Sequence, residues 1–375
     1  MPTILRDPWI LSALGILLVG FGFQLELLHD NWHAGGHIWQ QGDWLISLAS
    51  GPVRRGAFGE LLLTLSDALK VSPLFMVIAI QTALVTFVFF GFARLLLRQQ
   101  RSVMALVVFS PGFFAILWGI DPSSSLRKEL IGLAALVWLA QPGGGMARLI
   151  LTGILMLIGG LGHEIIILLL PAWLVLLWLL HAPLLRRRYT WFFIALLFFL
   201  ATIELHYAIR HIGIADAAPV CEALTQRGLS ENALCRGAIT WLADPQNGTA
   251  KVWAALNRSW TSWLLPLAWI AATGPLWRIW NTSLPLRPRS AWLILAALAP
   301  ICLLYPVGLD WGRWFAVQFA ICAIILLGLG QRGLLQEVGT IRPAERTAWL
   351  VSSLSWGIIN DPVVTTYSFL ARLLD

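Results

Sequence analysis

Long apolar runs separated by short polar stretches make up most of the chain. A helix needs about 20 apolar residues to cross the ~30 Å hydrocarbon core of a bilayer. Runs that approach this length lie near 9–28, 72–97, 103–120, 126–140, 147–161, 163–181, 190–208, 260–280, 290–306 and 313–331. The apolar stretch from Leu149 to Pro183 is too long for one crossing, so we divide it at Gly159–Gly162. The pattern predicts an all-α polytopic membrane protein with about ten transmembrane helices.

The polar stretches between these runs suggest the domain organisation. Residues 1–331 are expected to form a single transmembrane domain with two longer loops, at 29–71 and 209–258. Within the first loop, Trp44–Ala49 and Phe58–Leu69 are predicted to be helices lying in the membrane interface. Residues 332–375 are too polar for a clear crossing, and we interpret them as a cytoplasmic or interfacial tail.

Composition agrees with this pattern and excludes several classes of protein. Of the 375 residues, 58% are hydrophobic and 12% charged, against about 45–50% and about 25% in soluble chains. A water-soluble enzyme, a disordered chain and a nucleic-acid-binding domain are excluded. The formal net charge of +7 is therefore interpreted as a record of membrane topology, with no nucleic acid as partner.

The basic residues predict the orientation, because cytoplasmic loops retain arginine and lysine. They fall in every second loop, at Arg94, Arg98, Arg101, Arg148, Arg186, Arg187, Arg188, Arg278, Arg287, Arg289 and Arg332. These loops and both termini are expected in the cytoplasm, and the first run is expected to act as an uncleaved signal anchor. The chain is thus predicted to lie in a bacterial inner membrane, with loops 29–71 and 209–258 in the periplasm.

The cysteines test this orientation. Cys221 and Cys235 both lie in the loop at 209–258. A periplasm oxidises such pairs, so we predict a disulfide between them, the alternative being two free thiols. Cys302 and Cys322 lie within apolar runs and are expected to be packing residues.

Ionisable residues that the topology does not explain gather on the predicted periplasmic side. They are Asp30, Asp43, Arg54, Arg55, Glu60, Asp67, Asp121, Arg127, Lys128, Glu129, His163, Glu164, Asp310 and Arg313. A charge at the centre of the bilayer costs about 2.5–3.5 kcal/mol, so such residues must face a cavity or one another. Simpler roles exist for some of them: interfacial snorkelling for Arg54 and Arg55, helix capping for Asp121, a structural ion pair for Asp310 and Arg313, and a satisfied polar residue for His163.

Together these residue types indicate group transfer from a lipid diphosphate. Guanidinium groups bind phosphate oxygens bidentately and stabilise a departing diphosphate, which suggests this role for Arg54, Arg55, Arg127, Lys128 and Arg313. Asp121, Glu129 and Trp311 are further candidates for substrate contact. The carboxylate of Glu164, Asp43 or Asp310, with a pKa raised by an apolar setting, would accept the proton of a sugar hydroxyl, and His163 would orient it.

A resemblance supports this interpretation. The strings Gly-Pro-Val-Arg54-Arg55-Gly56, Arg127-Lys128-Glu129, His163-Glu164 and Asp310-Trp311-Gly312-Arg313-Trp314 resemble those of Wzy-type repeat-unit polymerases and GT-C-like glycosyltransferases of bacterial surface polysaccharides. The resemblance implies inverting, metal-independent transfer of a glycan from undecaprenyl diphosphate on the periplasmic face, with an essential acid at Asp30 or Asp43. The implied partners are a polyprenyl-diphosphate-linked oligosaccharide, membrane lipids and other polysaccharide-assembly proteins. The chain departs from a typical Wzy polymerase because it lacks a long central periplasmic loop and a large C-terminal soluble domain.

Other functions stay open at this point. A transporter or flippase for a lipid-linked or anionic solute would also have buried charges and broken helices, but the halves show no obvious repeat. An acyltransferase with His163 as base and a structural partner subunit are further alternatives. No metal site or cofactor is predicted, and the absence of an Asp-x-Asp pair favours a lipid-linked donor over a nucleotide-linked one. We expect two of Trp32, Trp39, Trp44, Trp311 and Trp314 to stack on sugar rings.

Overall fold

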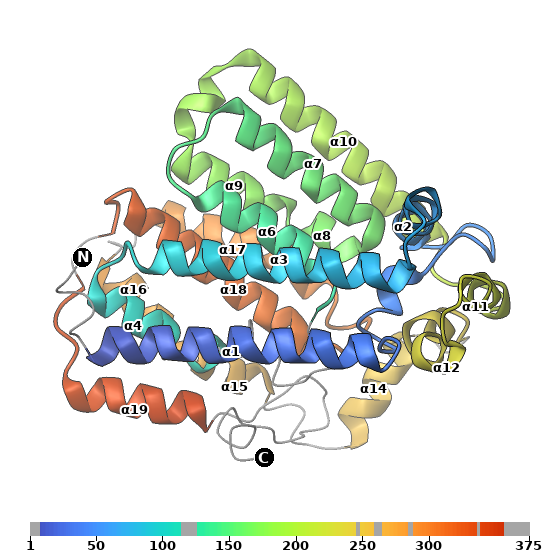
Figure 1. Ribbon diagram of the computed structural model, residues 1–375. Helices are drawn as coiled ribbons and strands as arrows, with labels where there is room; N and C mark the ends of the chain where they lie inside the picture. Colours follow the sequence, from blue (N-terminus) through green and yellow to red (C-terminus); the bar gives the residue numbers. More distant parts are fainter. Residues whose placement is uncertain are drawn as a thin grey trace.

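The computed structural model describes residues 8–113, 126–244, 248–258, 265–283, 288–335 and 338–355. Every regular element within these ranges is helical, which agrees with the predicted all-α class. Four helices are long and apolar enough to cross a membrane: α1 (Pro8–His33), α3 (Pro73–Leu96), α10 (Arg188–Arg210) and α18 (Trp311–Gln331). Helices α1 and α3 lie side by side along one face of the bundle (Figure 1). Helix α18 is the most deeply buried of the four and α10 the most exposed.

Shorter helices complete the bundle around these four. They are α4 (Arg101–Val108), α6 (Glu129–Ala140), α7 (Met146–Gly162), α8 (Glu164–Leu168), α9 (Leu170–Leu180), η4 (Ala182–Arg186), α15 (Leu265–Ala272), α16 (Gly274–Ser283) and α17 (Pro288–Cys302). Helix α6 is buried along almost its whole length and packs against α3, α7 and α18. The division expected at Gly159–Gly162 is present, because α7 ends at Gly162 and His163 has an extended backbone.

The count of about ten continuous crossings is not matched. The apolar run at 260–280 is divided between α15 and α16, and the run at 103–120 is described only as far as residue 113. In the tail, α19 (Pro343–Leu354) packs against α4, and the Ser353 hydroxyl donates a hydrogen bond to the Phe109 carbonyl. The tail therefore covers the bundle as far as it is described.

The first long loop contains one helix where two were expected. Helix α2 (Gly56–Leu69) matches the predicted helix at Phe58–Leu69. The predicted interfacial helix at Trp44–Ala49 is wrong: the chain forms a single 3-10 turn, η2 (Asp43–Leu45), and Trp44, Leu45 and Ile46 are fully buried. The reason is close packing, since Gly59 of α2 lies so near this stretch that a Cβ there would be 1.8 Å from the Ile46 carbonyl oxygen.

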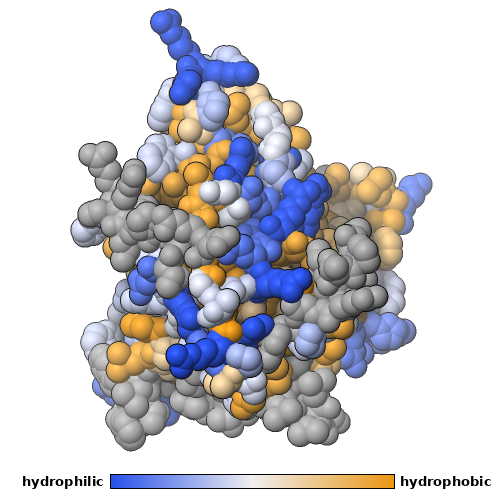
Figure 2. Space-filling model, turned by 90° about the vertical axis from the view of Figure 1, so that its left-hand side faces the viewer, coloured by the Kyte–Doolittle hydropathy of each residue, from blue (hydrophilic) through white to orange (hydrophobic). Residues whose placement is uncertain are grey.

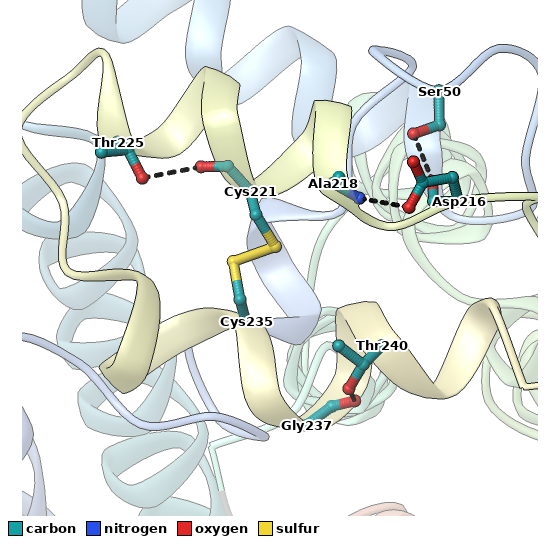
Figure 3. The surroundings of a disulfide bond; sticks show 8 residues. All are labelled: Ser50, Asp216, Ala218, Cys221, Thr225, Cys235, Gly237 and Thr240. Carbon is teal, nitrogen blue, oxygen red and sulfur yellow. Dashed lines mark hydrogen bonds between the residues drawn. A yellow bond between two sulfur atoms is a disulfide. The ribbon is translucent and has the colours of Figure 1, made fainter.

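The second long loop folds into a small helical insert. It contains α11 (Ala218–Thr225), α12 (Glu231–Leu234), the π turn η5 (Cys235–Ile239), α13 (Thr240–Leu242) and α14 (Gly248–Arg258). Cys221 of α11 and Cys235 of η5 form a disulfide across this insert, as predicted (Figure 3), with their Cα atoms 5.9 Å apart. Cys302, in contrast, is exposed at the end of α17 and Cys322 is half-buried, so the expected packing role does not fit Cys302.

The bundle has two different ends. Helices α2, α11 and α12 lie together at one, which we call the α2 end (Figure 1). At the opposite end α1 begins and α3 finishes, and hydrophilic residues gather over its middle (Figure 2). Arg94, Arg98 and the run Arg186–Arg188 are all exposed.

Candidate functional site

Charged side chains from five separate segments meet at the α2 end. We call them the charged cluster, which consists of Asp43, Arg54, Arg55, Arg127, Lys128, Glu129, His163, Glu164, Asp310 and Arg313. The segments are η2, the N-terminal side of α2, the start of α6, the junction of α7 and α8, and the start of α18. Each side chain thus lies at a helix end, where the fold brings together residues up to 270 positions apart (Asp43 to Arg313).

Glu164 anchors the two neighbouring arginines. Its Oε1 lies 3.1 Å from Arg54 Nη1 and 2.7 Å from Arg55 Nη2, and Arg55 Nε donates to its Oε2 at 3.0 Å. Arg55 therefore makes the bidentate fork that guanidinium and carboxylate groups favour. Its backbone is left-handed (φ 68°), a conformation that L-residues rarely adopt. The interfacial snorkelling role considered for both arginines is thus replaced by an ion pair with Glu164.

Asp43 is buried next to Arg55 and Lys128. Its side chain is 1% exposed, with Oδ1 at 3.3 Å from Arg55 Nη1 and Oδ2 at 4.0 Å from Lys128 Nζ. Burial alone would raise the pKa of Asp43, but the positive charges of Lys128, Arg55 and Arg127 outweigh burial and hold the pKa well below its usual range. The raised pKa expected for this carboxyl is therefore wrong, and Asp43 is a charged carboxylate.

Lys128 is the most deeply buried cation of the cluster. Its side chain is completely buried, its Nζ donates to the Gly162 carbonyl at 3.0 Å and lies 5.6 Å from the centre of the Phe58 ring. Gly162 makes this approach possible, because a Cβ there would lie 3.0 Å from Lys128 Cδ. The end of α7 and α2 thus enclose the lysine together.

A second group of contacts surrounds Glu129. Arg313 Nε lies 3.2 Å from Glu129 Oε1, and Arg313 Nη2 lies 2.8 Å from Asp310 Oδ2. His163 Nδ1 accepts a hydrogen bond from the Ile165 amide at 3.2 Å and caps α8. The proton of a neutral His163 ring is therefore on Nε2, which lies 3.8 Å from Glu129 Oε1. Asp310 and Arg313 do form the predicted ion pair, but Arg313 also belongs to the larger network.

The charge balance of the cluster favours an anion. Four carboxylates face five basic side chains, since Arg127 is buried among them with its guanidinium 5.5 Å from the Trp39 ring centre. Asp43 Oδ2 and Glu129 Oε2 are buried acceptors with no hydrogen-bond donor among the described residues, whereas Glu129 Oε1 is ion-paired with Arg313. A buried acceptor without a donor is costly. The cluster thus combines a surplus of positive charge with acceptors suited to hydroxyl groups.

A buried amide network positions the loop that carries Asp43. Gln41 Nε2 donates to Gln81 Oε1 at 2.7 Å, and Gln81 Nε2 donates to the carbonyls of Gln40 at 3.1 Å and Leu126 at 2.7 Å. Trp44 Nε1 donates to the same Leu126 carbonyl at 3.0 Å. The sequence did not lead us to predict a role for Gln40, Gln41 or Gln81; the signal was a lone glutamine, Gln81, inside the apolar run 72–97.

Several predicted site residues do not join the cluster. Asp30 is exposed on α1, and Glu60 accepts a hydrogen bond from the Leu48 amide. Asp67 pairs with Arg227 at the surface, at 2.7 Å. Trp311 is buried and donates to the Tyr305 carbonyl, so its role is packing. Asp121 lies outside the described residues.

Neither metal geometry nor comparison with known proteins identifies the site. Among the residues that the structure describes, no three His, Cys, Asp or Glu side chains are arranged to hold a metal ion. No protein-family model matches the chain, and no curated protein or solved structure is significantly similar to it. Inferences about function therefore depend on the charged cluster itself.

Proposed function

We propose that the protein is a membrane glycosyltransferase that takes a glycan from a polyprenyl-diphosphate donor during surface-polysaccharide assembly, as a repeat-unit polymerase or a related enzyme. The observation that carries the proposal is the charged cluster, in which five cations and four carboxylates meet at one end of an apolar bundle, with Asp43, Arg127, Lys128, Glu129 and Arg313 buried. A diphosphate suits such a site because guanidinium forks bind its oxygens and keep their charge at any physiological pH.

In the proposed reaction, the arginines and Lys128 hold the diphosphate. The acceptor hydroxyl attacks the anomeric carbon of the donor sugar as the bond from that carbon to the diphosphate oxygen breaks. The electron pair of this bond leaves with the diphosphate, where the cations stabilise the new charge. The reaction would invert the anomeric configuration and use no metal or other cofactor.

Asp43 is the proposed acceptor of the hydroxyl proton. Glu164 is already engaged by Arg54 and Arg55, whereas Asp43 Oδ2 is buried without a hydrogen-bond donor among the described residues. The low pKa of Asp43 results from nearby cations. A bound diphosphate would partly neutralise those cations and raise the pKa of Asp43, so its basicity would increase when the donor is present. His163 caps the start of α8 and so positions the neighbouring Glu164.

The proposal includes a bacterial inner membrane, with the α2 end facing the periplasm. Two observations support this orientation. The arginines of alternate loops, such as Arg94, Arg98 and Arg186–Arg188, are exposed, as expected for cytoplasmic loops. The Cys221–Cys235 disulfide belongs to the α2 end, and disulfides persist in oxidising compartments. The proposed partners are the lipid-linked oligosaccharide, membrane lipids and other assembly proteins.

A transporter is the main alternative. Its charged site would be expected near the middle of the membrane, at broken helices. The charged cluster lies at helix ends instead, which favours chemistry at one face of the membrane.

Deletion of the gene, followed by gel analysis of surface polysaccharide and of lipid-linked intermediates, tests the proposal. We expect single repeat units without long chains, and restoration of long chains by the wild-type gene and by Arg227→Gln, which alters the surface pair with Asp67 and a hydrogen bond to the Ala223 carbonyl, away from the charged cluster. Asp43→Asn should not restore them, although the purified variant should still bind undecaprenyl diphosphate. An unchanged polysaccharide ladder after deletion would contradict the proposal. Donor stranded in the cytoplasmic leaflet would indicate a transporter.

A further inference from the structure

The disulfide-closed insert packs directly on the loop that carries Asp43. The Ala238 amide donates to the Ile38 carbonyl at 3.0 Å, which joins the insert to the first long loop. Two glycines permit this contact: a Cβ at Gly42 would lie 2.6 Å from the Leu234 carbonyl oxygen, and one at Gly237 would lie 2.5 Å from that of Ile38. The insert is therefore packed closely against the first long loop, next to the charged cluster.

The disulfide holds η5, the part of the insert that contacts the first long loop. Cys235 begins η5, which contains Gly237 and Ala238 and leads into Trp241 of α13. Its bond to Cys221 connects η5 to α11 (Figure 3). Two constraints shortly before Trp241 in the chain thus set its position: the disulfide at Cys235 and the backbone hydrogen bond from Ala238 to Ile38.

Two tryptophans meet where the insert and the first loop touch. The rings of Trp39 and Trp241 are 6.0 Å apart between centroids, at an angle of 68°. Arg127 of the charged cluster lies 5.5 Å from the Trp39 ring centre, so the pair adjoins the cluster directly. Lys251 Nζ, which pairs with Asp244, lies 3.5 Å from the Trp241 ring centre.

Trp241 is nevertheless 42% exposed. An exposed aromatic ring that is held in place by its neighbours suits a ligand with both apolar and polar faces. The C–H face of a sugar ring is apolar and weakly positive, so it stacks on the negative face of an indole, while its hydroxyls stay available for hydrogen bonds.

We propose that Trp39 and Trp241 form a glycan subsite, which stacks sugar rings of the substrate while the charged cluster holds the diphosphate. This inference depends on the proposed function and adds to it the residues that bind the glycan. Two of five tryptophans were predicted from sequence to stack on sugars; the inference selects Trp39 from those five and adds Trp241, which was not among them.

The test compares two probes on full-length protein in lipid nanodiscs. One probe is undecaprenyl diphosphate without a glycan, and the other is the lipid-linked glycan that accumulates in the gene-deletion strain. The wild-type protein should bind the glycosylated lipid more tightly. Trp241→Leu and Trp39→Leu should each weaken binding of the glycosylated lipid about three- to tenfold. Trp241→Leu should leave the Kd of the bare lipid unchanged, whereas Trp39→Leu also removes the ring beside Arg127.

Two controls separate stacking from misfolding. Trp241→Phe keeps an aromatic face and should retain most of the preference for the glycosylated lipid. Trp32→Leu removes a comparably exposed ring that packs against Phe75 of α3, and it should leave both affinities unchanged.

The outcomes distinguish this inference from the proposed function. If Trp241→Leu and Trp39→Leu bind both probes as the wild type does, or if Trp241→Leu loses affinity for both equally, the glycan subsite is wrong while diphosphate binding stands. If the wild-type protein binds neither lipid, the proposed function fails and the subsite fails with it.

Discussion

Arginines have opposite surroundings at the two ends of the molecule. At the opposite end, Arg94, Arg98 and Arg186–Arg188 are exposed. At the α2 end, Arg127 and Arg313 are each 8% exposed and Lys128 is completely buried, among carboxylates from other segments. The same residue type is therefore exposed at one end and buried among carboxylates at the other.

This contrast identifies the informative feature of the sequence. Exposed ion pairs contribute about 0–1 kcal/mol, whereas buried charges must be compensated by partners within the fold. The segments 54–55, 127–129, 163–164 and 310–313 differ from the arginine-containing segments of the opposite end because their basic residues come with carboxylates from the same or other segments at the α2 end. Acids near arginines at one membrane face thus indicate a site better than the number of arginines does.

The largest expected effect follows from removing the anchor of two arginines. Glu164→Gln leaves Arg54 and Arg55 side by side without their shared negative charge. Breaking a buried ion pair from one side typically costs about 3–5 kcal/mol, so the thermal unfolding midpoint of the purified protein should fall clearly. Asp67→Asn, which breaks the surface pair with Arg227, should lower it far less. Equal shifts for the two variants would contradict the distinction between buried and exposed charges.

The disulfide comes next in expected size. Cys221 and Cys235 are 14 positions apart, and closing a loop of about 15 residues stabilises a fold by about 3 kcal/mol in the chain-entropy model. Serine at both positions should lower the unfolding midpoint, and a reducing agent should lower that of the wild-type protein similarly. Cys302→Ser, at an exposed free thiol, should change nothing. If the reducing agent leaves the unfolding midpoint of the wild type unchanged while the double variant is destabilised, the loss of stability would come from altered packing and not from the lost cross-link.

Much of the fold follows from local pattern, whereas part of the site does not. Length and hydropathy predicted the long helices α3, α10 and α18 and the break after Gly162, because these features depend on neighbouring residues. The burial of Trp44 and the network around Gln81 depend instead on how close α2 and residue 126 come to the first loop. No local periodicity encodes such contacts.

Charge supplied long-range information of another kind. Ionisable groups in apolar sequence are unstable alone, so their presence in four separate regions predicted that they meet. Which carboxylate pairs with which cation was not predictable, and a raised pKa was expected for one of Glu164, Asp43 and Asp310. The surrounding cations lower the pKa of Asp43 instead.

A smaller loss of stability, whose size should change only at acid pH, tests whether Asp43 is held as a charged carboxylate. Its pKa is lower in the folded protein than the usual value of about 3.9, so its charge stabilises the fold above that pH and the contribution is lost as the pH falls towards the folded-state pKa. At pH 7, Asp43→Asn should therefore be destabilised by about 1–3 kcal/mol. The gap to the wild type should narrow steadily below about pH 4. A gap that stays constant down to the lowest pH tolerated would mean that Asp43 is not held as a charged carboxylate.

The smallest expected effect is at the opposite end of the molecule. Arg98 is exposed just after α3, and exposed substitutions usually change stability by less than about 0.5 kcal/mol. Arg98→Gln should therefore leave both the unfolding midpoint and long-chain polysaccharide unchanged, because the remaining basic residues of that end still define the orientation. Arg313→Gln, which removes the same charge from contact with Glu129 and Asp310, should reduce both. If the two variants have the same unfolding midpoint and the same long-chain polysaccharide, burial and pairing do not distinguish the arginines of the two ends. The charged cluster would then not be a functional site.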